Sequence, residues 1–101
     1  MHHNLSTPRS IRAAIRSKEK QRAELLDQCD ALERRLARHA DDWREADEER
    51  DQARAANILL AWEHDRAALG LMQTQAKDLL DECTRLCGIL SRQRVALDAA
   101  A

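Results

Sequence analysis

A chain of 101 residues is long enough for one domain at most. Charged residues make up 35% of it and aromatic residues only 2%, while two Gly and one Pro interrupt a sequence dominated by Ala, Leu, Arg and Glu. This composition is typical of long helices, it excludes a β-sheet core, and the net charge of −1 gives no overall field that would attract nucleic acid or a membrane.

Residues 1–7 are expected to form a short flexible arm before the first helix. Thr7 can cap that helix, and Pro8 suits its first position, where a missing N–H costs nothing. The arm has no apolar run and no stretch approaches the ~20 apolar residues of a membrane span, so neither a secretory signal nor a membrane partner is predicted. An odd number of cysteines, three, fits a reduced cytoplasmic compartment. Arg outnumbers Lys fourteen to three, which with abundant Ala is typical of a bacterial or phage protein.

The first predicted helix begins with a basic patch. The basic side chains that share one side of it are Arg9, Arg12, Arg16 and Lys20, with Lys18 and Arg22 beside them. The stretch from Ala13 to Lys18 resembles part of the basic region of basic-zipper proteins, and this resemblance implies contacts with DNA. Ser10 stands where that family carries a base-reading Asn, and Ile11 and Ile15 put apolar bulk on the face that would meet DNA. Nucleic-acid binding is therefore kept as an alternative function.

A first apolar seam follows the basic patch. Its members, spaced by four, three and four residues, are Leu25, Cys29, Leu32 and Leu36, and the same spacing leads on to His39 and Trp43. This period is that of an amphipathic helix, predicted here over residues 8–39. The chain is expected to turn at residues 39–42, because Asp42 can cap a new helix with Glu45 three residues later. One continuous helix, with its seam rotated by a register shift, is the alternative.

A second helix is predicted over residues 42–98, with residues 99–101 as a C-terminal tail. Its seam alternates steps of four and three through Ile58, Trp62, Asp65, Leu69, Met72, Ala76, Leu79, Cys83, Leu86, Leu90, Gln93 and Leu97. Only Asp65 and Gln93 interrupt the apolar pattern. The register continues through Gly70, so this glycine is expected inside the helix, where close approach of another helix would be a reason for it. Flanking residues such as Leu59, Leu80 and Cys87 make the stripe wider than that of a two-stranded coiled coil.

These patterns predict an all-α fold of long amphipathic helices, arranged as an antiparallel hairpin or a coiled coil within one helical domain, residues 8–98. A thin hairpin buries little surface, so two copies are expected to dimerise into a helical bundle. The predicted self-association seam comprises Leu25, Cys29, Leu32, Leu36, Ile58, Leu69, Leu79, Cys83, Leu86 and Leu90. A net charge of +5 over residues 1–22 and −5 over residues 23–50 suits antiparallel self-pairing or a charged partner.

No catalytic, cofactor or metal site is predicted, so the chain is not expected to be an enzyme. Cys83 and Cys87 lie one helical turn apart and could supply half of a zinc site with Cys29 or His64, but no second close pair completes it. The acidic run from Asp41 to Asp51 lacks the pattern of a calcium loop. No Gly-rich phosphate loop or nucleophile–base motif is present in the sequence. Cys29 and Cys83 are therefore expected to be buried thiols.

The leading interpretation is a small non-enzymatic regulator that binds another protein and acts by stoichiometric occlusion. Anti-activators, chaperone-like proteins and phage-encoded inhibitors are proteins of this kind. Trp43 and Trp62 are the only aromatic residues and the predicted interface anchors, because Trp is enriched among binding hot spots. Met72, Leu80 and Cys87 are the other predicted partner-binding residues. The alternatives are a nucleic-acid-binding regulator that uses Arg9, Arg12, Arg16 and Lys20, or a structural coiled-coil scaffold.

Overall fold

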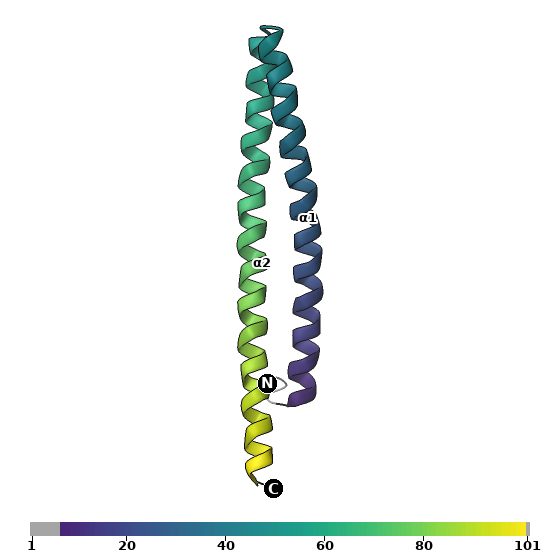
Figure 1. The fold of residues 1–101 in the computed structure, drawn as a ribbon, viewed down its shortest axis with the longest axis vertical. Helices are drawn as coiled ribbons and strands as arrows, with labels where there is room; N and C mark the ends of the chain where they lie inside the picture. Colours follow the sequence, from purple (N-terminus) through teal and green to yellow (C-terminus); the bar gives the residue numbers. More distant parts are fainter. Residues whose placement is uncertain (1–6, 101) are drawn as a thin grey trace. The chain divides into compact units, whose positions relative to one another are not determined.

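The computed structural model describes residues 7–100, which form two long helices and no strand. Helix α1 (Pro8–Glu48) and helix α2 (Gln52–Ala100) are joined by three residues and form an antiparallel hairpin (Figure 1). The predicted all-α hairpin is confirmed, and the alternative of one continuous helix is wrong. The predicted flexible arm falls mostly on residues 1–6, which lie outside the described residues, as does residue 101.

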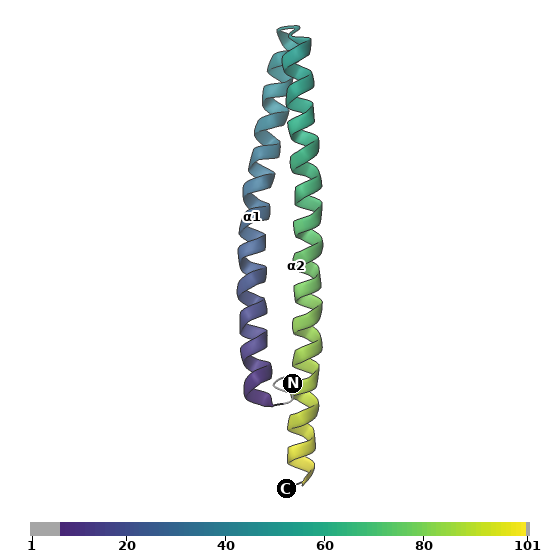
Figure 2. The same ribbon diagram turned by 180° about the vertical axis from the view of Figure 1, so that it is seen from behind.

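Two compact units make up the chain, and each contains part of both helices. Unit 1 comprises Met1–Glu24 and Gln75–Ala101, and unit 2 comprises Leu25–Thr74, which includes the turn. Within each unit the residues of α1 and α2 lie side by side, as the two opposite views agree (Figures 1 and 2). Over the described residues, neither helix has an apolar stretch that could cross a lipid bilayer.

Helix α1 begins at a capped N-terminus. The Oγ1 atom of Thr7 accepts a hydrogen bond from the backbone N–H of Ser10 (3.1 Å), and the Thr7 carbonyl accepts one from the N–H of Ile11 (3.0 Å). Pro8 occupies the first helical position, where its fixed φ is already helical. The cap satisfies backbone donors that the first helical turn would otherwise leave without a partner.

The turn lies at residues 49–51, so the predicted turn at residues 39–42 is wrong. Nothing in that earlier segment ends a helix, and α1 runs through it without a break. The helix ends instead in a Schellman motif, in which the N–H of Asp51 bonds to the carbonyl of Ala46 (2.9 Å) and the N–H of Arg50 to that of Asp47 (3.0 Å). Arg50 has φ of 58°, the left-handed conformation that this motif requires.

Asp51 also begins the second helix, which makes the connection very short. Its Oδ1 atom accepts a hydrogen bond from the N–H of Arg54 (3.1 Å), and its carbonyl accepts one from the N–H of Ala55 (3.0 Å). The Arg54 guanidinium then reaches back to the turn and to α1, with Nη1 3.1 Å from Oε2 of Glu49 in the turn and Nη2 3.6 Å from Oε2 of Glu45 in α1. Asp51 therefore fills the capping role that the sequence assigned to Asp42.

The core of unit 2 is thin and lies between the two helices. Cys29, Leu32 and Leu69 form its buried centre, and Leu36, Ala68 and Met72 pack against it. Nearer the turn, the buried residues are Ala46 and Ala55. Small side chains at these positions let the two helices converge toward a connection of three residues.

Unit 1 has its own buried residues. Ile11 and Leu86 are fully covered, and Ala76 and Cys83 are buried with them. The Cys83 thiol points at the α1 backbone, with Sγ 3.9 Å from the carbonyl oxygen of Ile15. Apolar contacts between α1 and α2 therefore hold this unit together as well.

Helix α2 passes through Gly70 without interruption, as the register of its seam predicts. The suggested reason for Gly70 is wrong, because a Cβ atom added there would meet nothing within 4 Å. The helix also extends to Ala100, so residues 99 and 100 are helical rather than part of a tail. Ala residues are strong helix formers, which explains why the helix continues to the end of the described chain.

Candidate functional site

The predicted self-association seam is covered within one chain. All ten of its residues are buried or half-buried: Leu25, Cys29, Leu32, Leu36, Ile58, Leu69, Leu79, Cys83, Leu86 and Leu90. In the core of unit 2, for example, Leu32 of α1 and Leu69 of α2 belong to one cluster. The seam residues therefore hold the two helices of one chain together, and the more exposed apolar side chains lie outside the seam.

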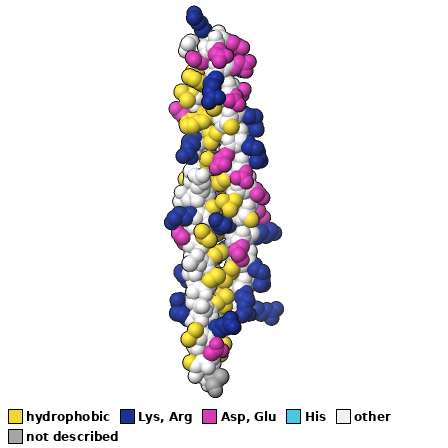
Figure 3. All heavy atoms as spheres, viewed as in Figure 1, with side chains coloured by type: hydrophobic (Ala, Val, Ile, Leu, Met, Phe, Trp, Pro, Cys, Tyr) yellow, Lys and Arg dark blue, Asp and Glu magenta, His cyan; other side chains and the backbone are white. Residues whose placement is uncertain are grey.

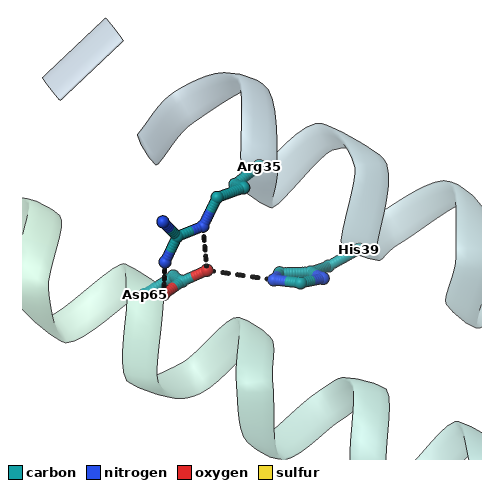
Figure 4. Close-up of polar contacts among 3 residues, drawn as sticks. All are labelled: Arg35, His39 and Asp65. Atoms are coloured by element: carbon teal, nitrogen blue, oxygen red, sulfur yellow. Dashed lines mark hydrogen bonds and ion pairs between the residues drawn. The ribbon is translucent and has the colours of Figure 1, made fainter. Parts of the chain in front are cut away.

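A polar cluster interrupts the apolar core of unit 2 (Figure 4). Asp65 of α2 is only 4% exposed, and its carboxylate accepts three hydrogen bonds from α1. Arg35 donates two of them, from Nη2 to Oδ1 at 2.6 Å and from Nε to Oδ2 at 3.1 Å. His39 Nε2 donates the third, to Oδ2 at 2.9 Å, since an ionised carboxylate can only accept.

These contacts keep the Asp65 carboxylate ionised in a place where burial opposes charge. Hydrogen bonds from Arg35 lower the pKa of Asp65, and the contact with His39 acts in the same direction, against the desolvation that would raise it. The same carboxylate raises the pKa of Arg35. A two-pronged bond between a guanidinium and a carboxylate has strict geometry, so the cluster fixes the register of α1 against α2 within unit 2.

From the sequence pattern, Asp65 was predicted only to interrupt the apolar seam of the second helix. A signal was available, because an acid at a seam position needs a cationic or hydrogen-bonding partner when it is buried. His39 stands at the continuation of the first seam, and Arg35 precedes it by one helical turn. Matching Asp65 of the second seam with His39 and Arg35 of the first helix would have predicted this polar cluster.

An apolar hollow lies on unit 2 beside this cluster, and we call it the Trp hollow. It has a volume of about 370 Å³, and its lining residues are His39, Ala40, Trp43, Arg44, Leu59 and Trp62. Trp43 and Leu59 are 40% and 45% exposed, while Trp62 is half-buried. His39 belongs to both features, so its bond to Asp65 fixes one wall of the hollow.

Acidic side chains gather at the end of unit 2 that holds the turn, on the face that the space-filling view shows (Figure 3). Between residues 41 and 51 there are seven acids, Asp41, Asp42, Glu45, Asp47, Glu48, Glu49 and Asp51, against two arginines. Arg44, which lines the Trp hollow, pairs with Asp41 at 2.9 Å. The Trp hollow is therefore an apolar site near the acidic turn of unit 2.

The structure brings together two of the five predicted partner-binding residues, Trp43 and Trp62, at the Trp hollow. Met72 packs against the core cluster of unit 2, and Leu80 and Cys87 are exposed in unit 1. Leu59 was noted in the sequence only as a flank of the seam, yet it lines the hollow. Which flank of α2 remains uncovered depends on the packing of α1, which the sequence pattern does not give.

The three cysteines do not form a ligand set. Among the described residues, no group of three His, Cys, Asp or Glu side chains is arranged to hold a metal ion. Burial raises the pKa of the Cys29 and Cys83 thiols, which keeps them protonated. Cys87 is exposed.

The basic patch at the start of α1 is a solvent-facing surface of unit 1. Its four predicted nucleic-acid-binding residues, Arg9, Arg12, Arg16 and Lys20, are all exposed. Arg12 also lines a hollow that includes Pro8, Cys87 and Leu90.

Comparisons with models of protein families, with curated proteins and with solved structures found no match to this chain.

Proposed function

We propose that this chain binds another protein through the Trp hollow and acts by covering a surface of that partner. The observation that carries the proposal is the gathering of Trp43, Leu59 and Trp62 from both helices into one partly exposed apolar site. Partly exposed aromatic and aliphatic side chains of this kind are the usual anchors of protein interfaces. The polar cluster beneath supports it, because it holds His39 in a fixed position before any partner arrives.

The dimensions of the Trp hollow define one feature of the partner. A site of about 370 Å³ accepts a large apolar side chain together with part of its backbone. The two indole rings among its lining residues favour a large apolar group, such as Phe, Leu or Met. The partner therefore presents one large apolar residue on an exposed helix or extended segment.

The surrounding charge defines a second feature. Seven acids against two arginines between residues 41 and 51 favour a partner segment with Lys or Arg on either side of the apolar residue. Such charge steers the approach of the partner and raises the association rate, an effect that salt screens. The recognised segment is thus basic and apolar, and binding should weaken as the salt concentration rises.

A displayed library of random peptides tests both features. The full chain is used for selection, and peptides that also bind the support without the chain are removed. We expect the remaining peptides to share a large apolar residue flanked by Lys or Arg. Leu97→Ala is the matched control, because Leu97 is an exposed apolar residue of unit 1 and its loss should change nothing.

Binding of the selected peptides should fall by about tenfold or more with Trp43→Ala or Leu59→Ala, as for truncation of a hot-spot residue. Peptides that bind the wild type and both variants equally would mean that the Trp hollow is not the binding site. A consensus with acidic flanking residues would contradict the charge argument. Circular dichroism of each variant shows whether the helices persist.

Nucleic-acid binding is the second candidate, supported by the exposure of Arg9, Arg12, Arg16 and Lys20 on one helix. Contacts with phosphates would release counterions, so the affinity for DNA or RNA would fall steeply with salt. Replacing Arg9, Arg12 and Arg16 with Ala should then abolish retention on nucleic acid and flatten this salt dependence. Absence of retention at low salt would remove the candidate.

A further inference from the structure

Helix α2 exposes far more apolar surface than α1. Eight large hydrophobic side chains of the described residues are exposed, and six of them belong to α2: Leu59, Leu60, Leu71, Leu80, Val95 and Leu97. A helix with a single apolar face needs one neighbouring helix to cover it. A helix with two apolar faces needs a second neighbour for the other face. Helix α1 supplies the first neighbour of α2, and no other element of residues 7–100 covers the second apolar face.

Within unit 2 this second face forms a continuous stripe, which we call the outer stripe. Its residues are Ala53, Ala56, Leu60, His64, Ala67, Leu71 and Thr74, all of them exposed. They recur at steps of three or four, so they share one side of α2 over roughly 30 Å. At about 100° per residue, the stripe lies opposite the seam residues Ile58, Leu69 and Met72.

The outer stripe is distinguished by its lack of charge. The α2 residues 52–74 include four charged side chains, whereas the α1 residues 25–48 of the same unit include twelve. Two of the four, Arg54 and Asp65, form ion pairs with side chains of α1. Glu63 lies at the edge of the stripe, and Arg66 lies farther round α2 on the same flank. Depletion of charge over an exposed face is a property of the central part of protein interfaces.

We propose that the outer stripe binds the outer stripe of a second copy, with the two α2 helices antiparallel about a two-fold axis. The order of large and small residues along the stripe supports this antiparallel register. With the axis between Glu63 and His64, Leu60 lies beside Ala67 of the second copy, and Leu71 lies beside Ala56 of the second copy. Each large side chain then meets a small one, which packs without voids.

The charges at the edge of the stripe agree with this register. In an antiparallel pair about a two-fold axis, the same flank of both helices meets, so Glu63 lies near Arg66 of the second copy. Both pairs form at once, because the symmetry makes the contact reciprocal. A parallel pair would instead set each residue against its own copy, with Leu60 against Leu60 and the small Ala67 against Ala67.

This arrangement differs from dimerisation through the seam. The seam is already covered by the packing of α1 on α2, so the second copy contacts the opposite face of α2. The Trp hollow is lined by other residues, with Leu59 and Trp62 outside the stripe. Dimerisation and binding of a partner protein therefore use different residues, and different substitutions test them.

Sedimentation equilibrium of the full chain over a range of concentrations tests the proposal. The variant Leu60→Glu with Leu71→Glu places four charges in the dimer interface and should raise its dissociation constant at least about tenfold. The matched control is Val95→Glu with Leu97→Glu, on the same helix and with exposed fractions of 66% and 66%, against 64% and 68% for Leu60 and Leu71. The control should remain a dimer.

A wild-type chain that is monomeric at every concentration would overturn the proposal. So would a dimer that tolerates the Leu60→Glu and Leu71→Glu pair while circular dichroism shows intact helices. If that variant loses its helices, Leu60→Gln with Leu71→Gln repeats the test with a smaller perturbation.

The orientation is tested by cross-linking two differently tagged chains that carry Cys87→Ser to remove the exposed thiol. One chain also carries Leu60→Cys and the other Ala67→Cys. Antiparallel pairing brings the two new thiols together, so oxidation should give mainly the mixed disulfide. Equal amounts of mixed and like-with-like products, or an excess of like-with-like products, would contradict the antiparallel register.

Discussion

Arg50 is the one non-glycine residue of the described chain with a positive φ, 58°. The left-handed conformation crowds Cβ against the backbone, at a cost of about 1 kcal/mol that glycine avoids. The Schellman motif at the end of α1 nevertheless requires it, since the N–H groups of Arg50 and Asp51 turn back to the carbonyls of Asp47 and Ala46. Nothing in the structure explains why arginine rather than glycine occupies this position.

Arg50→Gly should therefore stabilise the fold by about 0.5–1 kcal/mol, because the relief of strain exceeds the added freedom of the unfolded chain. Urea denaturation followed by circular dichroism measures the change. Arg38→Gly is the control, since Arg38 is an exposed arginine inside α1, and there glycine should destabilise by about 1 kcal/mol. Destabilisation by both substitutions would show that the positive φ at Arg50 carries no strain.

Asp65 makes the stability of the fold depend on pH. Its pKa in the folded chain lies below that of an unfolded aspartate, mainly because of the hydrogen bonds from Arg35. Ionisation therefore favours the folded state. The stabilisation is complete above the unfolded pKa of about 4 and is lost as pH falls through the lower folded value.

Asp65→Asn should lower the urea midpoint clearly at pH 7 and by less at pH 3, below the unfolded value of about 4, because the unfolded carboxyl is then protonated and ionisation favours the folded state less. At neutral pH the variant leaves Arg35 without its carboxylate in a part-buried setting. Glu82→Gln is the matched control, because the pKa of Glu82 is also lowered, by Arg85, but this pair is exposed. Its substitution should have little effect at either pH. An Asp65→Asn effect that is the same at both pH values would exclude the charge-based explanation.

Gly70 weakens α2 at a place where its small size serves no packing purpose. A Cβ there would meet no atom within 4 Å, and the φ of this glycine is not positive. Gly70→Ala should thus stabilise the protein by up to about 1 kcal/mol, the difference in helix propensity. Gly88→Ala should help slightly less, because its Cβ would lie 3.4 Å from Arg92 Nη1, a close contact with the end of a flexible side chain. Thermal melts of the two variants give the comparison, and a loss of stability in Gly70→Ala would mean that this face of α2 is covered.

The helices themselves follow from sequence because their signals are local and repeated. The pair Thr7 and Pro8 marks the start of α1, and spacings of three and four residues mark the buried faces. The turn was predicted at the wrong position because no glycine, proline or asparagine marks it in the sequence. Arg50 adopts the conformation usual for glycine, and Asp51 caps α2 from within a long run of similar acids.

The Trp hollow and the Asp65 cluster were predictable only in part, because they depend on how the two helices pack. Trp43 and Trp62 stand out by their rarity, and the structure places both at the Trp hollow. Leu59 and the Asp65 cluster depend on which residues of α1 lie opposite which residues of α2. A seam that is apolar over many turns fits several registers almost equally well, so periodicity alone does not choose among them.

At the scale of the whole molecule, the amount of buried surface sets the stability. The buried hydrophobic residues of the described chain include three alanines and two cysteines beside four larger side chains, of which only Ile11 and Leu86 are fully covered. A single hairpin with so thin a core is expected to be marginally stable. A dimer through the outer stripe would then add to the stability of the fold as well as to its assembly.

The thermal midpoint should accordingly rise with protein concentration, because association favours the folded state by mass action. Substitutions of two leucines test the core and the dimer interface separately. Leu69 is 5% exposed and belongs to the core, whereas Leu71 is 68% exposed and belongs to the outer stripe. Leu69→Ala removes a core contact and should lower the midpoint at every concentration, by the equivalent of about 2–4 kcal/mol. Leu71→Ala should leave the midpoint of the dilute protein nearly unchanged and reduce its rise with concentration. If both substitutions shift the midpoint equally at all concentrations, the outer stripe contributes to folding of the single chain and not to pairing of two.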